Sequence, residues 1–357
     1  MTEVLNTGST IGILGGGQLG RMLSVAASRL GFKTHIFEPG ANPPAGHVAD
    51  VVTTASYDDE AALKAFASSV DVITYEFENV PTSALDLLES VSPIRPNRRA
   101  LAVSQDRITE KDFLSGLGLK VAPYAAVDTA EDLDKALAEI GAPAILKTRR
   151  FGYDGKGQAR IMDRADAASA LADMASAPSV LEGFVSFSHE VSVIAARGQA
   201  GDVSCFDPGE NVHVNGILHT TTVPANLTST QRMDAVLLAA NILNALDYVG
   251  VMGVELFVTP EGLVVNEIAP RVHNSGHWTQ NGCVIDQFEQ HIRAVVGWPL
   301  GDGKRHSNVE MLNLIGDDMD SVADYAKDGS VALHLYGKAE VKAGRKMGHV
   351  NKVTGAA

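Results

Sequence analysis

The fold is decided by residues 253–278, which read GVELFVTPEGLVVNEIAPRVHNSGHW. Two short apolar runs, Val254–Val258 and Leu263–Ile268, flank a Pro-Glu-Gly segment at 260–262. Short runs that are rich in Val and Ile and broken by Pro and Gly are typical of a β-hairpin. We predict a three-residue loop in which Gly262 adopts the left-handed conformation.

This loop sets the register of the hairpin and brings two acidic side chains together. The facing pairs are then Val258 with Val264, Phe257 with Val265, and Glu255 with Glu267. Opposed like charges destabilise a strand pair, so the two glutamates need a compensating cation. Carboxylates and an amide oxygen, such as that of Asn266, are ligands that Mg²⁺ prefers, and Mg²⁺ usually completes its shell with water and substrate phosphates. The hairpin therefore indicates a magnesium–nucleotide site, although two solvent-facing glutamates on an ordinary hairpin would give the same pattern.

The residues directly after the hairpin favour a site over an ordinary hairpin. Polar side chains follow one another closely there: Arg271, His273, Asn274, Ser275 and His277. Polar groups this dense after a buried strand are typical of a functional site.

Length and composition limit the class of protein. A chain of 357 residues is long enough for two or three domains, each with its own core. The hydrophobic fraction of 45% and the charged fraction of 20% are those of a soluble globular protein. The net charge of −14 argues against a nucleic-acid or anionic-membrane partner, because phosphate groups require a basic face.

The low cysteine content and the lack of a secretion signal in the first ten residues predict a cytoplasmic protein. Cys205 and Cys283 are too few for a disulfide framework and lack metal-site spacing, so we expect buried, unreactive thiols. The first ten residues have no secretion signal, and no apolar run reaches about 18 residues.

The N-terminal region carries a dinucleotide-binding fingerprint. A strand over Thr10–Leu14 leads into GGGQLG at 15–20, a helix over Arg21–Leu30, a strand over Thr34–Phe37 and then Glu38. This order of elements is typical of a doubly wound domain and, at face value, of an NAD-dependent dehydrogenase. The glycines provide a tight turn and a helix N-terminus that can receive an anion, but they do not specify which anion.

The same domain continues with alternating strands and helices. We predict strands at Val51–Thr54 and Val70–Tyr75, helices at Glu60–Ala67 and Pro81–Glu89, a linker at Pro93–Arg99, and a helix from Gln105 to Leu117. Glu76 and Glu78 come just after a strand, at the edge where open α/β sheets bind ligands. Either carboxylate could bind a ribose hydroxyl, and equally both could be acidic residues favoured at a helix N-terminus.

The middle of the chain suggests a nucleotide site. A buried strand, Ala144–Lys147, leads into a glycine-rich basic loop at 148–158 whose backbone N–H groups could close over a triphosphate, with a flexible surface hairpin as the alternative. A strand at Ser179–Glu182 is followed by an antiparallel pair, a turn at Asn215-Gly216, and a helix at Gln231–Leu246.

These segments together resemble the ATP-grasp ligases, and specifically the family of 5-(carboxyamino)imidazole ribonucleotide synthases of purine biosynthesis. The motifs that carry the resemblance are GGGQLGRM (15–22), TYEFENV (74–80), QDR (105–107), FGYDGKGQ (151–158), NEIAPRVHNSGHWTQNG (266–282) and GRKMGH (344–349). Some family members carry a further stretch beyond the position of Ala357, which leaves the packing of the terminus open.

The resemblance implies an α/β (α+β) ATP-grasp fold. Its parts are an N-terminal doubly wound parallel-sheet domain (1–104), an ATP-grasp domain with antiparallel sheets (105–297, with lobes at about 105–180 and 181–297), and a small C-terminal domain (298–357). It also implies a cytoplasmic homodimer that binds small molecules and neither nucleic acid nor membrane.

The resemblance also assigns roles to individual residues. ATP would be bound by Arg107, Lys147, Gly152, Tyr153, Asp154, Gly155, Lys156, Gly157, Gln158, Glu182, Gly183, Phe184, Val185, Glu190, His213, Asn266 and Glu267. Two Mg²⁺ ions would lie against Glu255 and Glu267. Catalysis would fall to Arg271, His273, Asn274 and Asp154. Aminoimidazole ribonucleotide would be bound by Gln18, Leu19, Glu76, Glu78, Tyr153, Ser275, Lys338, Arg345 and Lys346, of which the last three would hold its 5′-phosphate.

The implied reaction uses ATP to join bicarbonate to the amine of aminoimidazole ribonucleotide through carboxyphosphate. Two alternatives remain: a sibling ligase that uses formate and acts on glycinamide ribonucleotide, and an NAD-dependent dehydrogenase. The dehydrogenase explains residues 10–38 and nothing after Lys147. A non-catalytic nucleotide sensor would not need both metal carboxylates.

Overall fold

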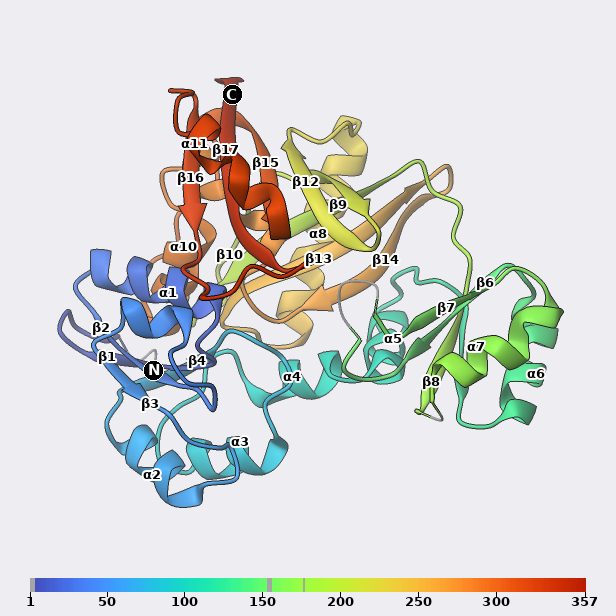
Figure 1. Ribbon diagram of the computed structural model, residues 1–357, viewed down its shortest axis with the longest axis horizontal. Coiled ribbons are helices and arrows are strands. Elements are labelled where there is room, and N and C mark those ends of the chain that lie inside the picture. Colours follow the sequence, from blue (N-terminus) through green and yellow to red (C-terminus); the bar gives the residue numbers. More distant parts are fainter. Residues whose placement is uncertain (1–3, 153–155, 176) are drawn as a thin grey trace.

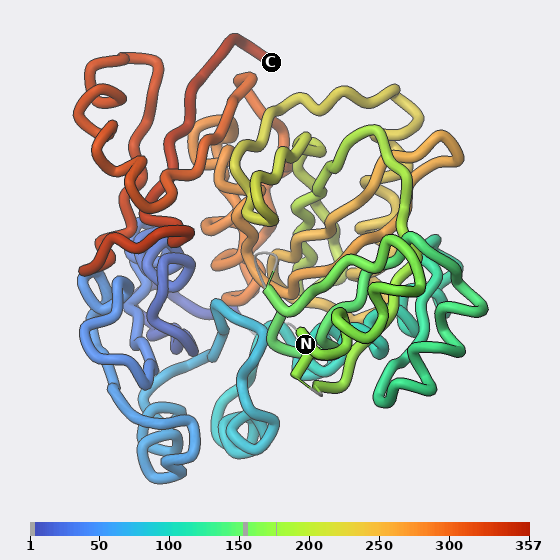
Figure 2. The backbone as a smooth tube through the Cα atoms, turned by 45° about the vertical axis from the view of Figure 1, so that its right-hand side comes forward, coloured from blue at the N-terminus to red at the C-terminus, as the bar shows by residue number. Residues whose placement is uncertain are grey.

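The computed structural model describes residues 4–152, 156–175 and 177–357 (Figure 1). Within these residues the strands form a four-stranded, a nine-stranded and a second four-stranded sheet. The path of the chain, followed from blue to red in Figure 2, passes through one four-stranded sheet, then the other, and ends in the large sheet. In this described part of the chain, no helix combines the length and the apolar character needed to cross a membrane.

The N-terminal sheet is parallel and has the order β3-β2-β1-β4, which confirms the predicted doubly wound domain. Its strands are β1 (Thr10–Leu14), β2 (Lys33–Phe37), β3 (Val51–Thr53) and β4 (Val72–Tyr75), and its helices are α1 (Gln18–Arg29), α2 (Glu60–Ser68) and α3 (Thr82–Glu89). The strands β1 and β4 lie side by side, so the glycine-rich loop after β1 and the acidic residues after β4 meet at one edge.

The segment predicted as a linker, Pro93–Arg99, is largely structured. Ile94 forms a parallel bridge with Ile73, and helix α4 (Arg98–Ser104) begins inside the segment. Helix α5 (Arg107–Gly116) begins two residues later than predicted, because the Asp106 side chain accepts hydrogen bonds from the first turn and acts as the N-cap.

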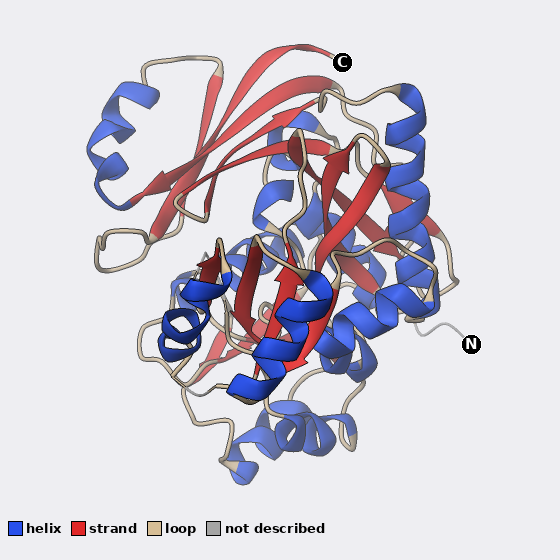
Figure 3. Cartoon of the chain, turned by 90° about the vertical axis from the view of Figure 1, so that its right-hand side faces the viewer, coloured by secondary structure: helices blue, strands red, loops and turns tan. Residues whose placement is uncertain are grey.

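The smaller antiparallel sheet has the order β5-β8-β6-β7. It comprises β5 (Tyr124–Val127), β6 (Ala144–Thr148), β7 (Gln158–Ile161) and β8 (Ser179–Gly183), with α6 (Ala130–Ile140) and α7 (Ala167–Asp173) covering one face (Figure 3). Leu146 and Leu181 pack in the core beneath these helices. Successive side chains of a strand point to opposite faces, so Lys147 and Glu182 point away from the helices.

The large sheet has the order β14-β13-β9-β11-β12-β15-β17-β16, with β10 paired to β9. Its strands are β9 (His189–Arg197), β10 (Val203–Cys205), β11 (Gly209–Val214), β12 (Ile217–Val223), β13 (Gly250–Thr259), β14 (Gly262–Ala269), β15 (Ser307–Ile315), β16 (Val331–Leu335) and β17 (Lys346–Ala356). The remaining helices are α8 (Ser229–Ala245), α9 (Thr279–Gly282), α10 (Gln287–Val296) and α11 (Val322–Tyr325). Strand β15 pairs with β12, so the large sheet continues into the C-terminal segment. The predicted start of a separate C-terminal domain at residue 298 stays a prediction.

The decisive hairpin is β13–β14, and its register differs from the prediction at the tip. Glu255 pairs with Glu267 as predicted, but Val258 pairs with Leu263 and Phe257 with Val264. Only Pro260 and Glu261 remain in the loop, since Thr259 pairs with Gly262. A β-bulge at Asn266 takes up the one-residue difference and restores the predicted pairing of the glutamates.

The N-terminal domain is fixed against the large sheet by a shared core and by a buried histidine. Ile13 and Leu23 belong to the same hydrophobic cluster as Phe288 of α10. His291 of α10 accepts a hydrogen bond from the Val251 N–H at Nδ1 (3.0 Å), and its Nε2 lies 2.8 Å from Thr74 Oγ1. Strands β4 and β13, which lead to the two halves of the candidate site, are thereby held together.

Candidate active site

The two opposed glutamates of the hairpin have different neighbours. Glu267 Oε2 lies 3.1 Å from Arg107 Nη1, whereas Glu255 Oε1 lies 3.4 Å from His273 Nε2. Burial and the charge of Glu267 raise the pKa of Glu255 to about 7. Burial also acts to raise the pKa of Glu267, but Arg107 and Lys147 outweigh it and hold that pKa below its usual value.

This asymmetry fits a divalent cation. One carboxylate is compensated by protein cations, while the other is buried and carries a charge that its surroundings disfavour. A buried carboxylate of this kind is stabilised by a bound metal ion. Glu255 and Glu267 could therefore hold Mg²⁺, and the bulge next to them sets the position of Asn266.

Two further predicted nucleotide residues lie beside Glu255. His213 Nδ1 is 3.1 Å from Glu190 Oε2, and one ligand atom each of Glu190, His213 and Glu255 lies within 4.8 Å of the others. Burial lowers the pKa of His213, but Glu190 raises it more. The ribose end of the predicted nucleotide site and its metal end are thus adjacent.

The opposite wall of the site comes from the smaller lobe. Lys147 Nζ donates a hydrogen bond to Glu182 Oε2 (2.9 Å), and Glu182 Oε1 lies 3.2 Å from Lys111 Nζ without accepting a hydrogen bond. Burial raises the pKa of Glu182, but Lys147 and Lys111 lower it more, so the carboxylate is ionised. An ionised, buried oxygen without a hydrogen bond fits the exocyclic amine of an adenine. The predicted adenine contacts Gly183, Phe184 and Val185 follow directly after it.

The glycine-rich loop that follows β6 is partly described. Tyr153, Asp154 and Gly155 lie outside the described residues, and their roles stay predictions. Gly157 has φ +69°, and a Cβ there would lie 2.6 Å from Thr148 Oγ1. Gln158 pairs with Lys147 in the sheet, so this end of the loop lies beside the predicted phosphate-binding lysine. Gly152 and Lys156, also predicted to bind ATP, belong to the same loop.

The fingerprint loop of the N-terminal domain is occupied by two of the chain's own carboxylates. Glu38 accepts a hydrogen bond from the Gly16 N–H (2.8 Å), and Glu76 accepts from the N–H groups of Gly17 and Gly20. These are the donors that a dinucleotide pyrophosphate would need. The dehydrogenase interpretation of the fingerprint is therefore wrong, because the carboxylates fill its anion site.

The predicted substrate residues near this loop are placed differently from one another. Gln18 begins α1 and is half-buried, whereas Leu19 packs in the core. Burial raises the pKa of Glu76. Glu78 instead forms a two-point ion pair with Arg271, with Nε–Oε2 at 2.6 Å and Nη2–Oε1 at 3.2 Å.

Arg271 and His273 lie at the junction of the two domains. The Arg271–Glu78 pair crosses from the loop after β14 to the loop after β4. Burial and the positive charge of Arg271 lower the pKa of His273 to about 3, so the imidazole is neutral near pH 7. Its Nδ1 lies 2.8 Å from Ser275 Oγ, which also accepts a hydrogen bond from Ser192 Oγ (2.7 Å).

Two residues predicted at this junction are engaged in the surrounding structure. The amide of Asn274 exchanges two hydrogen bonds with Asn313 of β15, at 2.9 and 2.8 Å. Ser275 is fully buried between Ser192 and His273. These contacts give both side chains a supporting position, and their direct roles stay predictions.

The three cations predicted to hold a 5′-phosphate lie in and around the start of β17. Lys338 Nζ donates to the Lys346 carbonyl (2.7 Å), and Arg345 Nη1 donates to the Glu340 carbonyl (3.0 Å). The charge of Lys346 contributes to the lowered pKa of His273 and opposes, without outweighing, the effects of burial and Glu267 that raise the pKa of Glu255. Lys346 therefore acts at the metal end of the site as well as beside Lys338.

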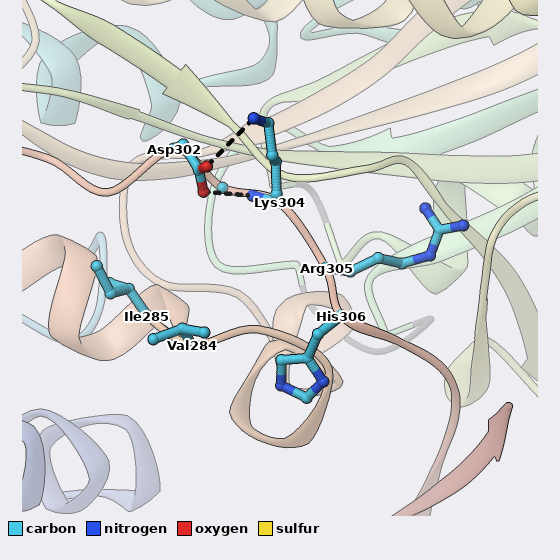
Figure 4. Close-up of a pocket in the computed structure, with 7 residues that line it drawn as sticks. Val284, Ile285, Asp302, Lys304, Arg305 and His306 are labelled. Atoms are coloured by element: carbon cyan, nitrogen blue, oxygen red, sulfur yellow. Dashed lines mark hydrogen bonds and ion pairs between the residues drawn. The ribbon is translucent and has the colours of Figure 1, made fainter. Parts of the chain in front are cut away.

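Two hollows of the described structure lie outside this cluster. One of about 210 Å³ is lined by Val284, Ile285 and Asp302–His306, and an ion pair of 3.5 Å joins Asp302 and Lys304 there (Figure 4). The other, of about 230 Å³, lies between α1 and β16. None of the predicted site residues lines either hollow, so the site is defined by converging charges and not by these cavities.

Sequence reasoning predicted Arg107 but missed Glu110 and Lys111 on the same charged face of α5. Arg107, Glu110 and Lys111 occupy positions i, i+3 and i+4 and point inward with Leu114 at i+7. Glu110 accepts a hydrogen bond from the Ile268 N–H (2.6 Å), and Lys111 reaches Glu182. The available signal was a helical stripe with charged residues where apolar ones are expected.

Comparison with protein families gives three adjacent matches. A model of the ribonucleotide synthetase preATP-grasp domain matches residues 8–105, one of the ATP-grasp domain matches residues 112–288, and one of the phosphoribosylaminoimidazole carboxylase C-terminal domain matches residues 310–356.

Individual relatives resemble the chain over nearly its full length. The N5-carboxyaminoimidazole ribonucleotide synthase of Brucella melitensis is 55% identical over 353 residues, covering 98% of this chain and 97% of that protein. The corresponding protein of Bacillus subtilis is 43% identical over 350 residues, covering 98% and 92%.

Solved structures resemble it equally well. An ADP complex of an N5-carboxyaminoimidazole ribonucleotide synthetase has a TM-score of 0.96 at 43% identity, covering 99% of this chain and 94% of the other. The Aspergillus clavatus enzyme in complex with ADP and 5-aminoimidazole ribonucleotide has a TM-score of 0.92 at 30% identity, covering 98% and 94%.

Proposed function

The chain belongs to the family of N5-carboxyaminoimidazole ribonucleotide synthases, and on this premise we propose that it carboxylates 5-aminoimidazole ribonucleotide with bicarbonate at the expense of ATP. The products are N5-carboxyaminoimidazole ribonucleotide, ADP and phosphate, in a step of purine biosynthesis. The observation that carries the proposal is the pair of opposed carboxylates, Glu255 and Glu267, between the cations of α5 and the Arg271–His273 segment.

ATP and Mg²⁺ fit the polar groups of this site. Arg107 and Lys147 carry positive charge toward the phosphates, and Glu182 Oε1 offers an acceptor to the adenine amine. Glu255 and Glu267 would hold the magnesium ions, which neutralise phosphate charge when bound.

The first chemical step is the activation of bicarbonate. A bicarbonate oxygen attacks the γ-phosphorus of ATP, the bond from that phosphorus to the β-phosphate oxygen breaks, and ADP leaves. Arg271 presents a planar pair of donors that suits the carboxylate end of bicarbonate, and Glu78 holds the guanidinium in place. A neutral His273 leaves the positive charge of this region on Arg271 and Lys346, next to the anions.

The second step transfers the carboxyl group. The exocyclic amine of the imidazole attacks the carboxyl carbon of carboxyphosphate, or of CO₂ released from it; the carbon–oxygen bond to phosphate breaks, and the amine loses a proton. Carboxyphosphate hydrolyses readily, so the site must exclude water during this step. Lys338, Arg345 and Lys346 bind the 5′-phosphate, and the enzyme acts as a cytoplasmic homodimer.

Phosphate release tests the proposal. The purified protein is mixed with ATP, Mg²⁺, bicarbonate and 5-aminoimidazole ribonucleotide, and each component is then omitted in turn. Full release should require all four. Release with formate and glycinamide ribonucleotide in place of bicarbonate and the imidazole would support the sibling ligase instead.

A further inference from the structure

Helix α5 carries a lysine whose side chain is almost completely buried. Lys111 is 1% exposed, and its ammonium faces Glu182, which is 4% exposed. Burying a lysine costs several kcal/mol unless the charge is paired. No step of the proposed reaction uses this ammonium, so its position needs another explanation.

The Glu182 carboxylate lies between two lysines that it contacts in different ways. Oε2 accepts a hydrogen bond from Lys147 (2.9 Å), whereas Oε1 lies 3.2 Å from Lys111 Nζ and accepts no hydrogen bond. Lys147 is the more exposed of the two lysines, with 13% of its side chain accessible against 1% for Lys111. Lys147 can therefore turn toward a ligand, and Lys111 cannot.

The two lysines consequently have different fates when a nucleotide binds. Lys147 is drawn to the triphosphate, which removes its hydrogen bond to Glu182. A buried carboxylate that lost its only counter-charge would take up a proton or move. Lys111 stays in place because its side chain is enclosed and the adjacent Glu110 is fixed by the Ile268 N–H.

We infer that Lys111 is a positioning residue that keeps Glu182 ionised and aimed at the exocyclic amine of adenine, and thereby sets the preference for ATP over nucleotides without that amine. This inference rests on the proposed nucleotide site. It assigns Lys111 no contact with the nucleotide itself, since Glu182 lies between them.

Inosine triphosphate provides the test, because a carbonyl oxygen replaces the amine and would face the Glu182 carboxylate. We measure binding of ATP and of inosine triphosphate to the wild-type protein and to Lys111→Met, which keeps the length of the side chain and removes its charge. A hydrogen bond to a charged group corresponds to a preference of roughly tenfold to a hundredfold. Wild type should show such a preference for ATP, and Lys111→Met should lose most of it.

Further variants sharpen the comparison. Lys120→Met removes an exposed lysine of the same unit and should keep the full preference. Lys111→Arg keeps the charge and should retain most of it. Glu182→Gln can present either an oxygen or an NH₂ group, so this variant should bind both nucleotides with similar affinity. Adding Lys111→Met to Glu182→Gln should not change the ratio of the two affinities further. Should Lys111→Met fail to fold, Lys111→Gln removes the positive charge and keeps a polar group beside Glu182, and it should lower the preference for ATP, whereas a merely structural role leaves that preference unchanged.

The contrary results are distinct. An unchanged ratio of ATP affinity to inosine triphosphate affinity in Lys111→Met would overturn the inference, whether or not both affinities fall. A merely structural role for Lys111 predicts this result. The proposed function is judged separately, by phosphate release from the wild-type protein with its full set of substrates.

Discussion

Glu255 and Glu267 face each other across one hairpin, yet replacing each by glutamine should change the stability of the metal-free protein in opposite directions. With metal removed by a chelator, Glu255→Gln relieves a buried charge whose pKa is raised to about 7, so the apo protein should gain about 1–3 kcal/mol of stability above pH 7. Glu267→Gln instead leaves Arg107 without its carboxylate partner and should lower stability. Both variants should lose about a hundredfold or more of turnover, because each removes a proposed metal ligand.

Thermal melting in chelator and turnover at ordinary Mg²⁺ measure these effects. Glu261→Gln, in the exposed loop of the same hairpin, serves as the matched control and should behave like wild type. Wild-type turnover in either site variant would contradict the metal assignment.

Arg271 should not be replaceable by lysine. Its two-point pairing with Glu78 fixes the plane of the guanidinium, and a lysine offers one point of contact only. We expect Arg271→Lys to lose about 2–4 kcal/mol of transition-state stabilisation while ATP affinity changes little. ATP affinity is measured by titration and carboxylation by a separate assay. If Arg271→Lys lowers ATP affinity as much as carboxylation, Arg271 binds the nucleotide and not bicarbonate.

At the scale of elements, α5 joins the two lobes, and Glu110 makes that junction sensitive to pH. Burial and the nearby Glu267 raise the pKa of Glu110 from 4.5 to about 8. Between pH 4.5 and pH 8 the folded protein keeps a proton on Glu110 that the unfolded chain has released. The contribution of Glu110 to stability is therefore fully present below about pH 4.5 and is lost as the pH rises to about 8. Glu110→Gln keeps an oxygen for the Ile268 N–H and removes the titration.

Stability of the two proteins measured from pH 5 to 8.5 tests this link. The variant should match wild type near pH 5 and exceed it by about 2 kcal/mol or more above pH 8. Parallel curves would show that Glu110 does not titrate in this range.

The glycine-rich turn before α1 should affect one substrate only. A Cβ at Gly17 would lie 2.6 Å from Glu76 Oε1, so Gly17→Val must displace that carboxylate. We expect about a tenfold or greater rise in the KM for aminoimidazole ribonucleotide, because the edge of the N-terminal sheet is disturbed, with ATP binding almost unchanged. Gly329→Val, at an exposed position with open space around it, is the control. A selective loss of ATP affinity would contradict the placement of the two substrates.

Local elements were predictable because their signals are local. The hairpin, the βαβ units and the Asn215-Gly216 turn, where both residues have positive φ, follow from period, turn chemistry and glycine placement. The bulge at Asn266 did not, because a two-residue and a three-residue loop fit the same Pro-Glu-Gly segment, and tertiary contacts decide between them. The filling of the fingerprint loop by Glu38 and Glu76 was also hidden, since Glu76 is 59 residues away from Gly17.

At the scale of the whole molecule, the three sheets bring together residues that the sequence separates widely. Arg107, Lys147, Glu182, Glu255 and Arg271 come from α5, β6, β8, β13 and the loop after β14. Arg107 reaches the hairpin through Glu267, and His291 fixes that hairpin to β4 of the N-terminal sheet. The sequence motifs indicated which residues belong to the site. Their order in space, including the continuation of the large sheet through the β12–β15 pairing, depends on long-range strand partners that no local pattern encodes.

The central claim is that bicarbonate is activated by phosphorylation, and the fate of its oxygen tests this most directly. The wild-type protein is given ¹⁸O-labelled bicarbonate with ATP, Mg²⁺ and aminoimidazole ribonucleotide, and the released phosphate is examined for the isotope. Attack of a bicarbonate oxygen on phosphorus predicts one labelled oxygen in each phosphate released. Phosphate without label would contradict the account, because ATP would then be cleaved by water or by another nucleophile.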